Sequence, residues 1–212
     1  MTTLSDLRGD ARLRLDDGVV PYLWSDAELD AWINEAIREA SLRAGLNRQK
    51  IEIDITAAES ECTLGESIVY VHRARLVSGN RVLDRTSRDD LDSCRTGWEA
   101  ATGSPRAFFI EGNTLTLYPN PIAADTLELR AECYPDLLEA DSDEVAFESH
   151  DVWPLLEWVI YRAAQKRDAD SILPNPDQYD SAFTRRFGPR PSARTRRGWQ
   201  EYGGTSTARI PA

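Results

Sequence analysis

Few side chains in this sequence have the type and the spacing that catalysis requires. The two histidines, His72 and His150, are far apart, and neither lies in a motif with a serine, a cysteine or a second histidine. We expect His72 to be an exposed or hydrogen-bonded residue at a strand end, and His150 to share in capping the start of a helix. Neither is expected to act as an acid or a base.

Two acidic clusters, in residues 89–92 and 141–144, are candidates for holding a hard cation. Neither has the alternating spacing of a calcium-binding loop, so we interpret both as solvated acidic turns. The sequence also contains no phosphate-binding glycine loop, no zinc-protease motif and no nucleophile elbow. It therefore predicts no catalytic residue, no metal and no cofactor, and it favours a protein that is not an enzyme.

The 212 residues, of which 41% are apolar, suffice for one large domain or two small ones. The three cysteines, Cys62, Cys94 and Cys133, are odd in number and not in CxxC spacing, which favours isolated thiols over a disulfide framework or a zinc site. No window approaches the roughly 18 uninterrupted apolar residues of a membrane helix, and residues 1–6 lack a signal-peptide pattern. We expect a globular, cytosolic product that does not enter a membrane.

Charge is unevenly distributed along the chain. The formal net charge is −11, but seven arginines and one acid lie from Arg185 to the C-terminus, so this segment carries +6 and residues 1–184 carry −17. An acidic body is not expected to bind nucleic acid tightly. The basic segment has two interpretations, a disordered solubilising terminus or a segment that docks on a partner or on the next subunit, since arginine forms fork-like pairs with carboxylates and phosphates.

Helical periodicity appears at both ends of the chain. Ser25 and Glu28 form a capping box ahead of an apolar stripe, which predicts a helix from about Asp26 to about Ala44 with Gly45 as its stop. Three further helices are predicted, over residues 3–15, from Ser149 or His150 to Asp168–Asp170, and from about Asp177 to Phe187.

From Ile51 the period changes to two, as a strand with one wet face requires. The strongest strand signal is a hairpin in which residues 108–110 and 115–117 flank Gly112-Asn113. Other strands are predicted over residues 51–55, 67–71, 75–77, 81–83 and 126–133. Hairpins of this kind argue for antiparallel pairing.

The order of helices, strands and helices favours an α+β fold. We expect the terminal helices, in residues 1–48 and 146–187, to form a helical bundle. Residues 49–145 are expected to be inserted as an antiparallel β lobe, and residues 188–212 to form an extended basic C-terminal arm.

Three blocks of sequence keep an order and spacing found together in one family. The first contains Leu7-Arg8, Asp10-Ala11-Arg12, Tyr22-Leu23-Trp24-Ser25-Asp26 and Asn34-Glu35-Ala36; the second contains Gly97-Trp98, Gly103-Ser104-Pro105, Phe108-Phe109-Ile110 and Leu115-Thr116-Leu117-Tyr118-Pro119; the third contains Tyr161-Arg162-Ala163-Ala164 and Arg167-Asp168-Ala169-Asp170. Together they resemble the head-to-tail adaptor, or connector, proteins of tailed bacteriophages. The resemblance covers most of residues 4–170.

The resemblance implies a structural, non-enzymatic virion protein, made in the cytoplasm of the host bacterium. Such a protein forms a homo-oligomeric, typically dodecameric ring that joins the portal protein to a tail or nozzle protein, and DNA passes through its channel without specific binding. On this model the basic arm attaches to the portal. The residues expected to make that contact are Arg190, Arg194, Arg196, Arg197, Trp199 and Tyr202.

Two other functions stay open. A tail-accessory cell-wall hydrolase would have to recruit a carboxylate pair such as Asp89 and Glu99. A nucleic-acid-binding protein would act through the arginine-rich C-terminal segment, and its affinity would fall steeply with salt.

Overall fold

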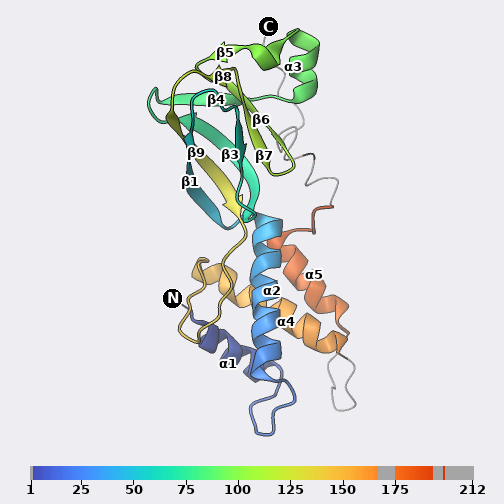
Figure 1. Cartoon of the computed structure of the whole chain (residues 1–212). Coiled ribbons are helices and arrows are strands. Elements are labelled where there is room, and N and C mark those ends of the chain that lie inside the picture. Colours follow the sequence, from blue (N-terminus) through green and yellow to red (C-terminus); the bar gives the residue numbers. More distant parts are fainter. Residues whose placement is uncertain (1, 167–174, 193–197, 199–212) are drawn as a thin grey trace. The chain divides into compact units, whose positions relative to one another are not determined.

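The computed structural model describes residues 2–166, 175–192 and 198 (Figure 1). The chain divides into two compact units. Met1–Asn47 and Tyr134–Arg190 form the first, which we call the helical unit, and Arg48–Cys133 form the second, which we call the β unit. The chain therefore leaves the helical unit once and returns to it.

The described residues contain five α-helices and one 3₁₀ helix. They are α1 (Leu4–Arg14), α2 (Asp26–Ala44), α3 (Arg88–Cys94), α4 (Ser149–Gln165), α5 (Asp177–Phe187) and the 3₁₀ helix η1 (Trp98–Ala100). The predicted helices over residues 3–15, 26–44 and 177–187 are confirmed, and α4 ends slightly earlier than expected.

The ends of α2 are determined locally. The hydroxyl of Ser25 accepts the Glu28 N–H while the Glu28 carboxylate accepts the Ser25 N–H, so the predicted capping box is formed. At the other end Gly45 has φ 60°, a left-handed conformation in which a side chain would be strained. An equivalent capping box, between Thr3 and Asp6, starts α1.

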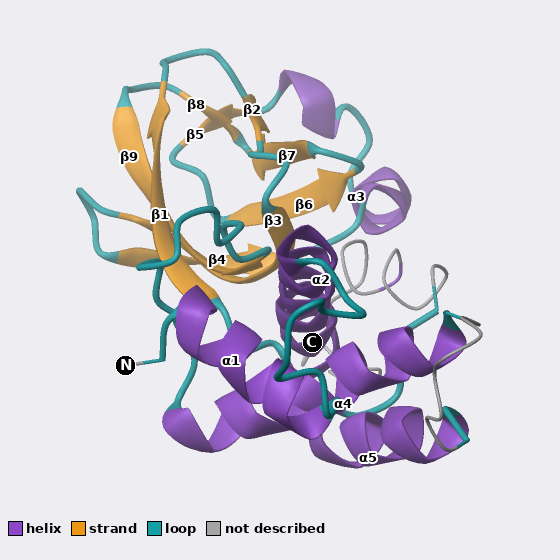
Figure 2. Ribbon diagram, turned by 90° about the horizontal axis from the view of Figure 1, so that it is seen from below, coloured by secondary structure: helices purple, strands orange, loops and turns teal. Residues whose placement is uncertain are grey.

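The helical unit has its own apolar core. The apolar stripe on α2 packs against that on α4. Figures 1 and 2 show α5 lying beside α4. The buried residues that α2, α4 and α5 contribute are Leu29, Ile33, Ala36, Ile37, Ala40, Val152, Leu155, Leu156, Trp158, Val159, Ile160, Ala163, Phe183 and Phe187. Their spacing of three and four residues explains why each helix buries one face.

The β unit contains the nine strands of the described residues. They are β1 (Arg48–Ile55), β2 (Glu61–Thr63), β3 (Ile68–Leu76), β4 (Arg81–Arg85), β5 (Thr102–Gly103), β6 (Ala107–Glu111), β7 (Thr114–Tyr118), β8 (Asn120–Pro121) and β9 (Asp125–Cys133). Seven form one sheet in the order β1-β9-β3-β4-β6-β7-β2, and β5 and β8 form a second, two-stranded sheet. Figure 2 shows that the larger sheet is strongly curled.

The predicted fold, a helical bundle with an inserted antiparallel β lobe and an extended arm, is wrong. The seven-stranded sheet is large and nearly closed, and it is mixed because β4 pairs in parallel with β6 while its other pairs are antiparallel. The two strands of the second sheet, β5 and β8, are also parallel. Turn residues reveal the antiparallel hairpins because those contacts are local, whereas β4 reaches β6 across residues 86–106, and no local pattern encodes that pairing. Residues 193–197 and 199–212 of the expected arm lie outside the described residues.

The predicted hairpin of residues 108–117 is confirmed, as β6 and β7. Both faces of this hairpin are covered by other residues of the β unit. Phe108 and Ile110 point into the core of the curled sheet, and Phe109 packs on the opposite face against Leu91 and Trp98. The hairpin therefore joins the sheet to α3 and η1, which explains its nearly continuous apolar sequence.

Candidate interaction surfaces

Four of the residues singled out as possible catalytic or metal-binding groups in the β unit have structural partners, namely His72, Asp90, Asp92 and Glu99. Nε2 of His72 lies 2.7 Å from Oε1 of Glu132, so the expected hydrogen bond is confirmed, but His72 lies in the middle of β3 and not at a strand end. Asp92 Oδ1 accepts the indole N–H of Trp98 at 2.6 Å, and Asp90 accepts the Ser87 hydroxyl at 2.7 Å. Glu99 lies 3.5 Å from the Arg88 guanidinium.

The acidic turn at residues 141–144 fastens the start of α1. Asp143 accepts the backbone N–H groups of Ala140 and Glu139, which lowers the pKa of its carboxyl group. Asp141 accepts a 2.8 Å hydrogen bond from Arg8, which is also paired with Asp30. This turn is thus an ordered part of the helical unit.

The three thiols are free. Burial raises the pKa of the Cys62 and Cys133 thiols, so at neutral pH both stay protonated. Cys94, near the end of α3, is exposed.

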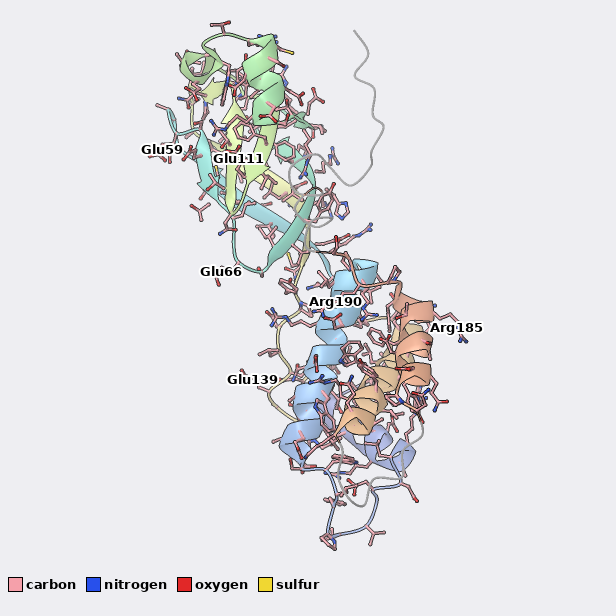
Figure 3. The ribbon with its side chains drawn as sticks, turned by 90° about the vertical axis from the view of Figure 1, so that its right-hand side faces the viewer. Glu59, Glu66, Glu111, Glu139, Arg185 and Arg190 are labelled. Carbon is pink, nitrogen blue, oxygen red and sulfur yellow. The ribbon has the colours of Figure 1, made fainter. Side chains whose placement is uncertain are left out.

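Only Arg190, of the six residues expected to bind a portal, lies in the described part of the chain. Its Nη2 lies 2.8 Å from Oε1 of Glu39, a buried residue of α2 whose Oε2 accepts a hydrogen bond from Arg43. Figure 3 shows Arg190 lying against α2. The other five residues lie outside the described residues: Arg194, Arg196, Arg197, Trp199 and Tyr202.

The segment before Arg190 is firmly held. Phe183 and Phe187 are buried, and the Arg43 guanidinium lies 5.0 Å from the ring centre of Phe183. Arg186 bonds to Asp151 Oδ1 at 2.8 Å, and the buried Asp151 lies in the first turn of α4, where the helix dipole favours a negative charge. The C-terminal segment therefore starts from a fixed point on the helical unit.

A buried ion-pair cluster, which we call the Arg12 clamp, fixes the loop between α1 and α2. Arg12 Nη1 lies 2.7 Å from Asp17 Oδ2, and its Nη2 donates to Trp24 O at 3.0 Å and to Asp26 Oδ1 at 2.6 Å. Asp17 in turn accepts the N–H groups of Leu23 and Trp24. The two ends of the loop are therefore joined through Arg12 and Asp17.

The middle of this loop, residues 18–23, is exposed and largely apolar, and we call it the loop tip. Val19 is 82% exposed and Val20 is 72% exposed. Leu13, at the end of α1, and Trp153, on α4, add exposed apolar surface to the same unit. Scattered exposed apolar residues are ordinary, but a group of them on a fixed loop indicates a contact surface.

The helical unit also contains a largely apolar groove of about 690 Å³. Residues from the N-terminus, from just beyond α2 and from the start of α4 line it: Thr2, Leu46, Glu144–Glu148, Asp151 and Val152. Its wall is fixed because Val145 N donates to Thr2 O at 3.0 Å. Neither the loop tip nor this groove is among the predicted sites. The sequence does contain a signal for the loop tip, because two adjacent valines follow Asp-Asp-Gly in a loop, where polar residues are usual.

Comparison with known proteins identifies the family. The family model of the SU10 adaptor protein matches residues 2–209. The chain belongs to this family of phage head-to-tail adaptors. The resemblance seen in the sequence is thereby confirmed, and membership in a structural phage family favours a non-enzymatic role in the virion.

A search of curated proteins finds no match to the chain. Among the described residues, no helix is both long enough and apolar enough to cross a membrane.

Proposed function

We propose that the protein is a structural subunit of the head-to-tail junction of a tailed phage, made in the host cytoplasm. Copies of it form a dodecameric ring, which joins the portal protein to a tail protein and surrounds the channel for DNA. The observation that carries this proposal is the match to the adaptor family over residues 2–209, which includes both units.

The charge of the two units suits a channel for DNA. The helical unit has ten more acidic than basic side chains, and the β unit has four more. An acidic wall repels phosphate, so DNA slides past it without being bound. Tight, salt-sensitive binding of duplex DNA by a chain that lacks residues 188–212 would contradict this part of the proposal.

We further propose that the C-terminal segment, residues 188–212, attaches the ring to the portal. Arginine pairs with carboxylates in a fork geometry, and tryptophan and tyrosine are frequent anchors of interfaces. Arg190 provides the fixed start of the segment through its contact with Glu39. Trp199 and Tyr202, with Arg194, Arg196 and Arg197, provide the groups for the partner.

Co-sedimentation with portal rings tests the role of this segment. Deletion of residues 188–212 is expected to abolish sedimentation with the portal. The matched control is deletion of residues 203–212, which keeps Arg190 and all five residues that are proposed to contact the portal. Unchanged binding by the longer deletion would overturn the assignment of the segment to the portal.

A further inference from the structure

The loop tip and the Leu46 side of the groove lie at opposite ends of α2. The loop tip comes just before Asp26, the first residue of the helix, and Leu46 of the groove comes just after its last residue, Ala44. A helix of 19 residues is about 28 Å long, at 1.5 Å per residue. Because a packed helix is rigid, the loop tip cannot reach the groove of its own chain.

The conformation of the loop tip is fixed before any partner binds. The Arg12 clamp joins its two ends, and the Arg12 guanidinium also lies 3.8 Å from the ring centre of Tyr22. Little conformational entropy is therefore lost when the tip becomes buried in an interface. Val19 and Val20 are the groups that gain most from such burial, because they are the most exposed side chains of the tip that are purely apolar.

The groove offers a matching surface. Five of its nine lining residues are apolar, and the other four are Thr2, Glu144, Glu148 and Asp151. Its volume lies within the roughly 300–1,000 Å³ typical of binding pockets. The groove also has three acids, of which Asp151 is buried and paired with Arg186, while Glu144 and Glu148 are exposed. The loop tip has no charged side chain, so its entry places no like charge beside them. The tip and the groove are thus compatible in polarity.

We propose that the loop tip of one copy inserts into the groove of the next copy. The proposal rests on the ring proposed above and specifies the contact between its subunits. Two different surfaces meet in such a contact, so copies join head to tail, and a head-to-tail contact closes into a ring when its rotation permits. Val19 and Val20 would lie against Ala146 and Phe147, which are not buried within their own chain.

Two single substitutions test the contact from opposite sides. Val19→Asp places a charge on the tip, and Ala146→Trp fills the groove from an exposed position. Each is expected to weaken self-association at least about tenfold in sedimentation velocity, because a desolvated charge or a steric clash costs more than about 1.4 kcal/mol. The matched control, Val82→Asp on the exposed β4 of the β unit, should leave self-association unchanged.

A mixture of the two variants distinguishes this contact from a symmetric one. The Val19→Asp copy keeps a free groove and the Ala146→Trp copy keeps a free tip, so the mixture should give heterodimers that grow no further. An isologous interface would stop the natural chain itself at dimers, so growth of the natural chain beyond a dimer separates the two arrangements. The absence of heterodimers, or unchanged assembly of either variant alone, would overturn the proposal.

Photo-crosslinking identifies the occupant of the groove. Full-length chain with p-benzoylphenylalanine in place of Val19 is mixed with heavy-isotope chain, both alone at high concentration and with portal rings. Crosslinks from light to heavy chains within residues 144–152 are expected. Crosslinks only elsewhere, or only within one chain, would overturn the proposal, as would a groove occupied by residues 193–212. Failure to bind the portal, with these crosslinks present, would instead count against the adaptor function.

Discussion

At the residue scale, Arg12 is the side chain on which the loop between α1 and α2 depends. We predict that Arg12→Ala lowers the free energy of unfolding of the helical unit by about 3–5 kcal/mol, because it leaves the buried carboxylate of Asp17 without its partner. Urea denaturation followed by tryptophan fluorescence measures this, since Trp24 adjoins the clamp.

Arg14→Ala is the matched control for that substitution. Arg14 lies on the same helix and pairs with Glu157, but both side chains are partly exposed, so its loss should cost less than about 1 kcal/mol. Equal effects of the two substitutions would show that the clamp does not stabilise the loop.

Glu28 gives a prediction on pH dependence. Its hydrogen bond from Lys166 and those from Ser25 lower the pKa of the Glu28 carboxyl group from 4.5 to about 2. A lowered pKa in the folded state means that the ionised form is the stabilising one. The contribution of Glu28 is therefore complete above pH 4.5 and is lost as the pH falls towards 2.

We predict that Glu28→Gln lowers the melting temperature at pH 7, and that the difference from the natural chain disappears near pH 2. Thermal unfolding followed by circular dichroism across this range measures the effect. A difference that stays constant between pH 7 and pH 2 would contradict the assignment of the stabilisation to the ionised carboxylate.

The residues that carry chemistry were partly predictable. The sequence predicted the partnership of Ser25 with Glu28 because capping depends on a three-residue spacing. It did not reveal the ion pair of Arg12 with Asp17 or the contact of Arg190 with Glu39, because arginines and acids are abundant and only the fold selects their partners. The groove could not be predicted from the sequence either, since only the fold brings Thr2, Leu46 and residues 144–152 together.

At the scale of elements, the turn of the β6–β7 hairpin depends on Gly112. Its φ of 59° is left-handed and its surroundings are open, so only backbone strain opposes a side chain there. We predict that Gly112→Ala lowers the free energy of unfolding of the β unit by about 1–2 kcal/mol, measured by urea denaturation.

The same substitution at Gly9 is the matched control. Gly9 lies in α1, and no atom lies within 4 Å of the Cβ that it would gain. Since α-helical backbone suits alanine, Gly9→Ala should stabilise the helical unit by roughly 0.5–1 kcal/mol. A loss of stability at both positions would show that φ at Gly112 is not the cause.

Element types followed from sequence more readily than their assembly. Periods of 3.6 and 2 separated the helices from the strands, and Ser25 and Gly45 marked the ends of α2. The short strands β2, β5 and β8, of two or three residues, are below the length at which a period can be seen. The parallel pairing of β4 with β6 joins residues 84–85 to residues 107–108, which lie far apart in the sequence. Because of this long-range contact, the sheet is mixed and nearly closed and not the expected antiparallel lobe.

At the scale of the whole molecule, the proposed function requires many copies to meet one portal. The acidic helical unit, its loop tip and groove, and the basic C-terminal segment each have a place in such a ring.

The mass of the complex formed with portal rings tests this account most directly. Full-length chain, 23.8 kDa per copy, is mixed with purified portal of the same phage and weighed by native mass spectrometry. We predict one complex whose added mass equals twelve copies, with no loss of the portal ring. A portal that gains no mass would contradict the account.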